Sequence, residues 1–561
     1  MRSSKAIPFS SLRMLLTSIL CLVPMVAALN DAYDIREATT DSIHNALFTG
    51  LATCRDIVSS YLARIEALNP TINSLTALNP EALSIADGMD LQVIQRNATG
   101  PLFCIPVLLK DNFDAVPMNT TGSCLALAGN KPTDDSPTVR ALKDAGAIIL
   151  GKTNMHELAL EGLTVSSLGG QTLNPYDQTR TPGGSSGGSG AAVAANFAVL
   201  ATGTDTMNSL RSPAASNSLF SFRPTRGLIS RAGVIPISYT QDAVGAMART
   251  VRDLAVALTV MAGVGNDPRD NATGLVPPGV IGTDYVAALR GGQGLSGLRL
   301  GLVKGFFDPT DSEETTPVNK IMATIVDKLQ SDGATVVDIT DAIYNTTAIS
   351  AALDVQAYEY REGLDGYLAS PSLSGDRPAN FEQLYTSGKF LVIPNQYSFI
   401  NESLISSTSN ESYFTAQRGI QNLTSALHTT FLANKLDALI YPEQKHLVVK
   451  VGSSSQSGRN GILAAVTGSP VVVIPAGFSE PSEDAPKGVP VGMEILGMPW
   501  SEGKLLNIAQ GISNILPVRK MPSFANSTVE VPAGGYEGVP VLTVTPLANI
   551  PPAYPVGRLY S

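Results

Sequence analysis

Residues 181–211, TPGGSSGGSGAAVAANFAVLATGTDTMNSLR, concentrate the chemistry of this 561-residue chain. The first half is a loop rich in glycine and serine, so its backbone can take conformations that a Cβ forbids while hydroxyl groups line it. Residues 190–199 are apolar and rich in alanine, which predicts a helix buried on most of its surface. The loop therefore lies at a helix N-terminus, where free N–H groups and the helix dipole favour negative charge.

The composition of the whole chain suits one large α/β enzyme core. Hydrophobic residues make up 44% of the sequence, which also contains 50 glycines. The net charge is −10, and the sequence contains no run of Lys or Arg. Both features argue against a nucleic-acid-binding surface. We therefore expect no nucleic-acid partner.

The N-terminus has the pattern of a secretory signal peptide. Basic residues precede an apolar run at residues 14–28, which ends in small residues, and this predicts a signal peptide of residues 1–28. The alternative is a membrane anchor, but the run is short for a span and contains Pro24. We expect a secreted protein without a stable membrane span, in which residues 29–534 form the catalytic domain. Residues 535–561 are rich in proline and predict a tail that wraps or dangles.

Several Asn-x-Ser/Thr sequons follow the predicted signal peptide. Together they predict a glycoprotein with these asparagines on its surface. They are Asn97, Asn119, Asn271, Asn345, Asn401, Asn410, Asn422 and Asn526.

Cysteine and histidine are too sparse for a disulfide framework or a metal site. Three cysteines remain after removal of the signal peptide, and they cannot all pair within one chain. Because Cys104 and Cys124 both lie near Lys110 in the sequence, a bond between them is a hypothesis. The four histidines are scattered and no CxxC or HExxH spacing occurs, so we expect no metal and no cofactor.

Strand and helix patterns alternate along the chain. Helices are predicted at residues 54–68 and 139–145, and strands at 105–109 and 147–150. Further strands are predicted at residues 298–303, 334–339, 437–441 and 471–475. This alternation predicts an α/β fold with a mixed or largely parallel sheet and helices on both faces.

Two lysines follow predicted strands and compete for the role of a base. Lys110 ends the strand at 105–109, and Lys152 follows the strand at 147–150. Such a lysine is either a solvated strand end or a desolvated amine whose lowered pKa lets it accept protons near neutral pH. His156 and Glu157 come next, and we expect these polar residues to begin a helix.

Six segments of the sequence resemble the amidase signature family of amide hydrolases, over about residues 40 to 515. They are TPGGSSGGSGAAVAA, PVLLKDN, GKTNMHE, TDTMNSLR, RPTRGLISRAGVIP and VPVGMEILGMPWSEGKLL. The resemblance implies a single α/β domain with a mixed central sheet that hydrolyses a small-molecule amide. It also implies a Ser-cis-Ser-Lys triad, in which Lys110 is the base, Ser185 the bridging serine and Ser209 the nucleophile.

These residue types suit amide hydrolysis. A serine hydroxyl needs a base, and Ser185 can accept the proton of Ser209 while it passes its own proton to neutral Lys110. Backbone N–H groups of Thr206, Met207, Asn208 and Ser209 are expected to form the oxyanion hole. Ser186 is expected to support the loop and the bound substrate.

The segment around Ser209 departs from the commonest family pattern. Met207 and Asn208 stand where two glycines are usual, and Met207 suggests an amide with an apolar acyl or aryl part. Asp205 and Arg211 are expected to fix this loop. The alternative for that pair is an exposed ion pair worth about 0–1 kcal/mol.

Other functions compete with this hypothesis. Residues 184–188 also fit G-x-S-x-G, the nucleophile elbow, which would make Ser186 the nucleophile and require a later Asp and His. Pro182 disrupts the strand that the elbow needs, and only His428 and His446 lie downstream. An acyltransferase that uses an amine in place of water and a catalytically silent binding protein remain open, as does the choice between monomer and homodimer.

Overall fold

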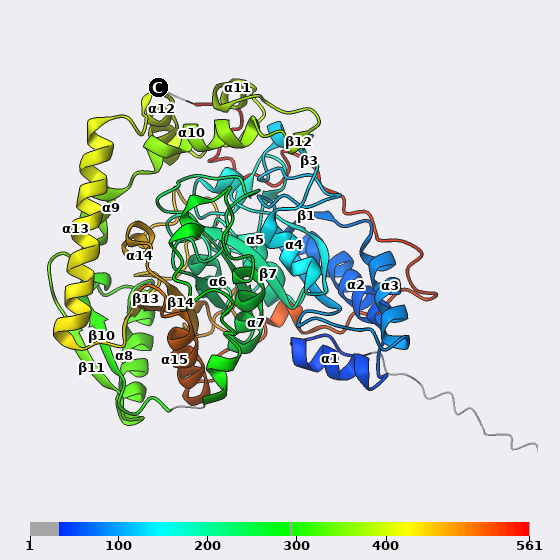
Figure 1. Ribbon diagram of the computed structural model, residues 1–561, viewed down its shortest axis with the longest axis horizontal. Helices are drawn as coiled ribbons and strands as arrows, with labels where there is room; N and C mark the ends of the chain where they lie inside the picture. The colour runs from blue at the N-terminus through cyan, green and yellow to red at the C-terminus, as the bar shows by residue number, and fades with distance from the viewer. Residues whose placement is uncertain (1–32, 292–293, 560–561) are drawn as a thin grey trace, which may run out of the picture.

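An 11-stranded β-sheet runs through the centre of the protein (Figure 1), in the computed structural model that describes residues 33–291 and 294–559. The strand order is β1-β4-β2-β7-β9-β8-β14-β15-β13-β10-β11. The strands are β1 (Leu75–Leu78), β2 (Ile105–Lys110), β4 (Ala147–Thr153), β7 (Leu200–Asp205), β8 (Phe220–Arg223), β9 (Ala243–Ala248), β10 (Arg299–Val303), β11 (Thr335–Ile339), β13 (Ala438–Pro442), β14 (Val471–Phe478) and β15 (Pro490–Leu496). Two short pairs lie outside it, β3 (Lys131–Pro132) with β12 (Leu373–Ser374) and β5 (Val165–Ser166) with β6 (Gly170–Gln171).

Both strand directions occur within the sheet. Strand β2 runs parallel to β4 and β7, and β10 runs parallel to β11 and β13. The strands between these two groups pair antiparallel, from β7 through β9, β8, β14 and β15 to β13. The predicted mixed sheet is therefore confirmed.

Helices cover both faces of the sheet, as the sequence predicts. One group contains α4, α7, α8 and α15, in which α7 packs on β8 and β9 and contacts both α4 and α15. In the other group α5 packs on β7 and against α6, which lies on β14 and β15. The helices are α1 (Thr40–Phe48), α2 (Cys54–Ile72), α3 (Ala82–Ile94), α4 (Pro137–Asp144), α5 (Gly187–Ala194), α6 (Arg211–Ser216), α7 (Val251–Ala262), α8 (Thr316–Ser331), α9 (Thr346–Leu353), α10 (Gln356–Leu368), α11 (Phe381–Thr386), α12 (Tyr397–Ile405), α13 (Glu411–Asn434), α14 (Ile462–Thr467) and α15 (Glu502–Ile515).

Helices α9 to α13 form a region beside the sheet that the sequence analysis did not predict. Figure 1 shows α13 along one edge of the molecule and α10 to α12 at its top. Aromatic residues of α10 and α11 build a core of their own, where Tyr360 packs edge-on against Phe381.

The helix after the Gly/Ser loop differs from its prediction. It spans α5, Gly187–Ala194, instead of residues 190–199, because Asn196 takes a left-handed conformation (φ 63°) and the N–H of Phe197 donates to the carbonyl of Ala192 at 2.9 Å, which ends the helix. Residues 200–205 then form β7 beside β2 through tertiary pairing, since the small residues of LATGTD have little intrinsic strand preference.

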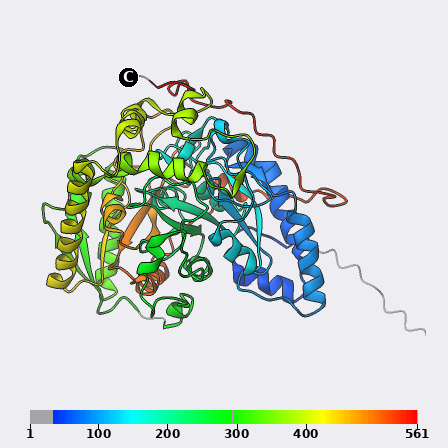
Figure 2. The same cartoon turned by 45° about the horizontal axis from the view of Figure 1, so that its top comes forward.

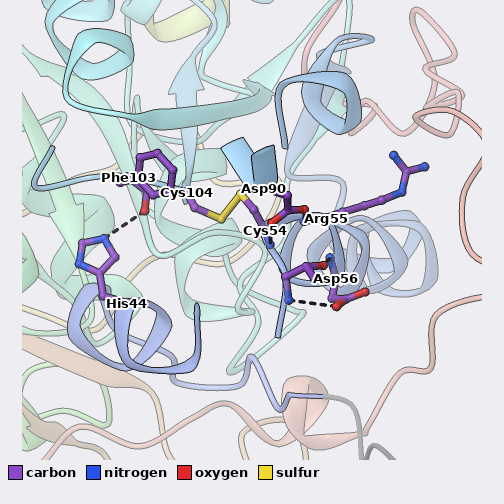
Figure 3. The surroundings of a disulfide bond; sticks show 8 residues. His44, Cys54, Arg55, Asp56, Asp90, Phe103 and Cys104 are labelled. Carbon is purple, nitrogen blue, oxygen red and sulfur yellow. Dashed lines mark hydrogen bonds between the residues drawn. A yellow bond between two sulfur atoms is a disulfide. The ribbon is translucent and has the colours of Figure 1, made fainter. Parts of the chain in front are cut away.

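The predicted Cys104–Cys124 bond is wrong: the disulfide joins Cys54 and Cys104 (Figure 3). Cys54 begins α2 and Cys104 immediately precedes β2, and their Cα atoms lie 5.8 Å apart. Cys124 is a buried free thiol that packs with the core of the α10–α12 region. Closeness in the sequence misled the prediction, because the chain leaves the sheet between residues 110 and 124.

The C-terminal tail wraps along the surface of the domain (Figures 1 and 2). The N–H of Leu547 donates to the carbonyl of Ser167 at 2.9 Å, and the N–H of Gly557 donates to Phe390 at 2.7 Å. Tyr554 is 3% exposed and packs with Leu163 and Leu391. The tail is thus tied to the hairpin that carries β5 and β6.

The predicted signal peptide, residues 1–28, lies outside the described residues. Within residues 33–291 and 294–559, no helix is long and apolar enough to cross a membrane. The same part of the chain holds no group of three His, Cys, Asp or Glu side chains arranged for a metal ion.

Candidate active site

Strand β2 carries Lys110 into the centre of the molecule. All six residues of this strand are buried, and the Nζ of Lys110 donates to the Oγ of Ser185 at 2.8 Å and to Thr204 Oγ1 at 2.7 Å. Burial lowers the pKa of Lys110 to about 7, although the negative charges of Asp205 and Asp242 oppose this shift. Near neutral pH this amine can therefore exist uncharged and accept a proton.

Ser185 is held in a loop whose shape depends on close backbone packing. The peptide bond between Gly184 and Ser185 is cis, as the family resemblance implies. The hydroxyl of Thr164 donates to the carbonyl of Gly183 at 2.7 Å, and the N–H of His156 donates to that of Ser185 at 3.0 Å. A Cβ on Gly188 would lie 2.1 Å from the carbonyl oxygen of Asn154, so this position requires glycine.

Ser209 lies between β7 and α6 on the loop that the sequence predicts as the oxyanion hole. It is 5% exposed, and its carbonyl accepts a hydrogen bond of 3.2 Å from the N–H of Ser186. This bond ties the loop of Ser209 to the loop of Ser185. The residues predicted as base, bridge and nucleophile are thus carried by neighbouring segments.

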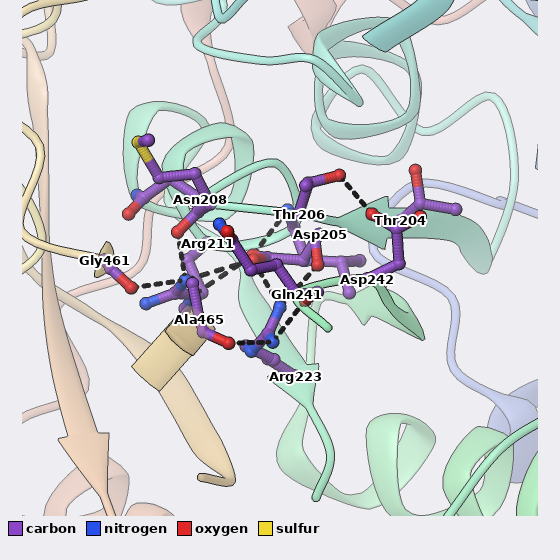
Figure 4. A network of polar contacts seen from close by, with 12 residues as sticks. Thr204, Asp205, Thr206, Asn208, Arg211, Arg223, Gln241, Asp242, Gly461 and Ala465 are labelled. Atoms are coloured by element: carbon purple, nitrogen blue, oxygen red, sulfur yellow. Dashed lines mark hydrogen bonds and ion pairs between the residues drawn. The ribbon is translucent and has the colours of Figure 1, made fainter. Parts of the chain in front are cut away.

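Asp205 and Arg211 form part of a buried charged network that fixes the loop of Ser209 (Figure 4). Arg211 Nε donates to Asp205 Oδ2 at 3.0 Å, and Arg223 reaches Asp205 Oδ1 at 2.8 Å. Arg211 also pairs with Glu494 of β15 at 2.9 Å, and the side chains of all four residues are fully buried. Burial alone would raise the pKa of Asp205, but the charges of Arg211 and Arg223 outweigh it and hold that pKa well below its usual range.

The alternative of an exposed Asp205–Arg211 ion pair is therefore excluded. Removal of one partner of such a buried pair leaves an uncompensated charge, which costs about 3–5 kcal/mol. The network also reaches the oxyanion loop itself, because Arg211 donates to the carbonyl of Met207.

Lys152, the rival base, serves a different part of the molecule. Its Nζ donates to the carbonyls of Phe113 and Asn119 at 2.7 and 3.1 Å and lies 3.5 Å from Asp111. These contacts hold the segment that follows β2. Lys152 therefore acts as a structural cation.

Ser186 lacks the partners of a nucleophile elbow. Its hydroxyl donates to the carbonyl of Thr204 at 3.3 Å. His446 contacts Gln444 and Ser457, and His428 lies on α13. The hydroxyl of Ser186 thus ties its loop to β7.

Comparison with known proteins shows the family of the chain. The family model described as Amidase matches residues 56–506. The chain belongs to the amidase family. It is an enzyme that hydrolyses carbon–nitrogen amide bonds.

Relatives of this amidase extend over most of its length. A glutamyl-tRNA(Gln) amidotransferase subunit of Chloroflexus aggregans is 31% identical over 499 residues, which cover 86% of this chain and 97% of the relative. A probable amidase of Arabidopsis thaliana is 31% identical over 513 residues, with coverage of 88% and 93%. The crystal structure of a peptide amidase from Stenotrophomonas maltophilia is 33% identical, with a TM-score of 0.74 and coverage of 87% of this chain and 99% of the other.

Two polar residues of this amidase's site were missed by sequence reasoning. Thr204 accepts hydrogen bonds from Lys110 and, at 3.1 Å, from Asn112. Glu443 contacts the side chain of Asn208. No local signal links Asn208 to Glu443, because 235 residues separate them.

Proposed function

We propose that this amidase forms an acyl-enzyme on Ser209 and moves protons through Ser185 to Lys110. The observation that carries this proposal is the 2.8 Å contact between the Nζ of Lys110 and the Oγ of Ser185 in a fully buried setting. The pKa of Lys110 is lowered to about 7 by its burial, so its neutral form is available to take up the proton.

In the first half of the reaction, Ser209 Oγ attacks the amide carbonyl carbon. The proton of Ser209 passes to Ser185, and the proton of Ser185 passes to Lys110. The carbonyl oxygen becomes an oxyanion that accepts hydrogen bonds from backbone N–H groups of residues 206–209, each worth about 2.7–4 kcal/mol. The carbon–nitrogen bond then breaks as the proton returns from Lys110 through Ser185 to the leaving amine.

In the second half, water attacks the ester on Ser209. Its proton follows the same path to Lys110, and the return of that proton to Ser209 releases the acid and restores the enzyme. Two alternatives to hydrolysis remain. If an amine attacks the ester in place of water, the enzyme is an acyltransferase. If Ser209 is unreactive, the protein is a catalytically silent binding protein. A fluorophosphonate probe mapped by mass spectrometry separates the silent protein from the enzyme. Product analysis with hydroxylamine as a competing acceptor separates transfer from hydrolysis.

The substrate is proposed to be a small amide with an apolar acyl or aryl part. The apolar side chain of Met207 on the oxyanion loop supports this. A cavity of about 20 Å³ that touches Thr204 and Thr206 is also mostly apolar, but it has room only for about one water molecule and is not the substrate pocket itself. The apolar residues in its wall are Ala159, Val234, Ile235, Pro236, Ile237, Ala243 and Val244, and the charged ones are Arg231 and Asp242. The similar structure named peptide amidase adds peptide amides to the panel, beside primary amides and anilides.

Secretion and glycosylation form part of the proposal. Seven of the eight sequon asparagines are exposed and Asn401 is half-buried, so glycans could be accommodated. The Cys54–Cys104 bond suits an oxidising compartment. The intact mass of exported protein, before and after glycosidase treatment, tests this. A product that retains residues 1–28 and loses no mass would refute it.

A further inference from the structure

Asn208, which stands in the oxyanion loop where the family usually has glycine, is fully buried beside the nucleophile. Its side-chain Nδ2 donates to the Oε1 of Glu443. Gly461 packs on the other side, because a Cβ there would lie 1.6 Å from Asn208 Oδ1. The contacts with Glu443 and Gly461 therefore fix the direction of the Asn208 side chain.

Glu443 offers a rigid partner to this side chain. It follows β13 directly and is 1% exposed. Its backbone N–H donates to the carbonyl of Gly492 at 3.0 Å, and its carbonyl accepts from the N–H of Asn460 at 2.9 Å. Both hydrogen bonds attach Glu443 to neighbouring chain segments, so its carboxyl group can hold Asn208 in place.

The charges around Glu443 favour its uncharged form. Arg211 and Arg223 are already balanced by Asp205 and Glu494, which makes Glu443 a third carboxyl group in the cluster. Arg459, the remaining cation that acts on it, is paired with Glu161 at 2.7 Å. Burial and then the charge of Glu494 raise the pKa of Glu443 to about 8, and Asp205 adds to this, while Arg459 and Arg211 oppose it.

We propose that Glu443 is a positioning residue whose carboxyl group holds the Asn208 side chain and thereby aligns the backbone N–H groups of residues 206–209 toward the oxyanion. This role of Glu443 rests on the Ser209 acyl-enzyme proposed above. Arg211 already fixes this loop through the carbonyl of Met207, and Glu443 fixes the next residue through its side chain. The two contacts leave the loop that precedes Ser209 little freedom to rotate its peptide groups.

Ionisation of Glu443 would oppose catalysis. A buried negative charge next to the loop would disfavour the negative charge that develops on the substrate oxygen. Acylation should therefore rise with pH as Lys110 becomes neutral, through about 7, and fall as Glu443 ionises, through about 8. The two groups together predict a narrow bell-shaped profile.

The rate of phosphonylation of Ser209 by a fluorophosphonate probe, measured from about pH 5.5 to about pH 9.5, tests this proposal. Glu443→Gln keeps an uncharged side chain of the same shape, so it should retain the rate at pH 7 and abolish the falling limb near pH 8. Glu443→Ala and Asn208→Ala should each slow labelling by about 10- to 100-fold, because a small displacement of the reacting groups costs up to that much. The double variant should be no slower than the slower single variant.

Glu502→Gln is the matched control. Glu502 is also a buried acid whose pKa burial raises, but it is bonded to Thr225 at 2.9 Å. Its replacement should leave both limbs of the profile in place. Should Glu443→Ala fail to fold, the Glu443→Gln profile still decides.

Two outcomes would overturn the proposal while the mechanism on Ser209 stands. One is a Glu443→Gln protein that keeps the falling limb, and the other is a folded Glu443→Ala protein that labels at the wild-type rate. If the wild-type protein carries label at a residue other than Ser209, the proposed function itself fails and takes this proposal with it.

Discussion

The Nζ of Lys110 and the Oγ of Ser185 lie 2.8 Å apart, although 75 residues separate them in the sequence. Lys110 comes from the end of a central strand, and Ser185 comes from the loop that begins α5. The sheet and the helix N-terminus thus meet at one buried hydrogen bond. Burial of its amine lowers the pKa of Lys110 to about 7, so that its neutral form becomes available near neutral pH. The same burial affects the stability of the fold.

Replacement of Lys110 by Met should abolish activity and stabilise the fold. The pKa of Lys110 falls from 10.5 in the unfolded chain to about 7 in the folded protein, so between these values the unfolded chain binds more protons. The burial of Lys110 therefore lowers the free energy of unfolding by its full amount below pH 7. This destabilisation diminishes as the pH rises from about 7 to 10.5. Lys110→Met should raise that free energy by about 1–3 kcal/mol at pH 7, measured by denaturant unfolding.

Lys152→Met is the control for this prediction. It leaves Asp111 buried without its cation and should lower the free energy of unfolding by about 3–5 kcal/mol. Stabilisation by both replacements would contradict the separate roles of the two lysines.

The rate of acylation should follow the protonation of Lys110. Labelling of Ser209 should increase as the pH rises through about 7, because the lysine must lose its proton before it can accept another. Lys110→Arg should give no labelling at any pH, since the guanidinium stays protonated. A flat profile between acidic and neutral pH would argue against Lys110 as the base.

The position of Lys110 could be predicted from the sequence because an apolar strand runs directly into it. The Gly/Ser loop and the Asp205–Arg211 pair are local patterns as well. Glu494 could not be assigned, because its contact with Arg211 depends on the order of strands β8, β14 and β15, which spacing along the chain does not specify.

Two of the strands that the sequence analysis missed share a physical reason. Strands β7 and β9 have the sequences LATGTD and AVGAMA, which contain few β-branched or aromatic residues. They pair because the central positions of the sheet admit small side chains: a Cβ on Gly245 would lie 2.0 Å from the carbonyl oxygen of Phe222. Burial and pairing outweigh their weak intrinsic preference.

Loss of the disulfide should destabilise the protein without changing its chemistry. Cys54 and Cys104 close a loop with a sequence separation of 50, and a cross-link of this length contributes about 2–4 kcal/mol. Cys54→Ser with Cys104→Ser should therefore lower the melting temperature and leave the Ser209 labelling rate at 25 °C within about threefold. Alkylation of the unfolded, unreduced wild-type protein should modify Cys124 and spare Cys54 and Cys104. Modification of Cys104 would contradict this pairing.

The C-terminal tail should stabilise the hairpin beside the Gly/Ser loop. Tyr554→Ala removes a buried ring from the cluster with Leu163 and Leu391, and should cost about 2–4 kcal/mol in thermal unfolding experiments. Val541→Ala, at a side chain that is 93% exposed, is the matched control and should have no effect. Equal melting temperatures for the two variants would show that the tail does not stabilise the domain.

The three serines of the site test the proposed mechanism most directly. Ser209→Ala should eliminate covalent labelling by a fluorophosphonate probe, since it removes the nucleophile. Ser185→Ala should slow labelling by several orders of magnitude because it interrupts the proton path to Lys110, whereas Ser186→Ala should have the mildest effect. The measurement is the labelling rate of each variant, with the modified residue identified by peptide mass spectrometry. We predict label on Ser209 alone in the wild-type protein; label on Ser186 that survives in Ser209→Ala would contradict the mechanism.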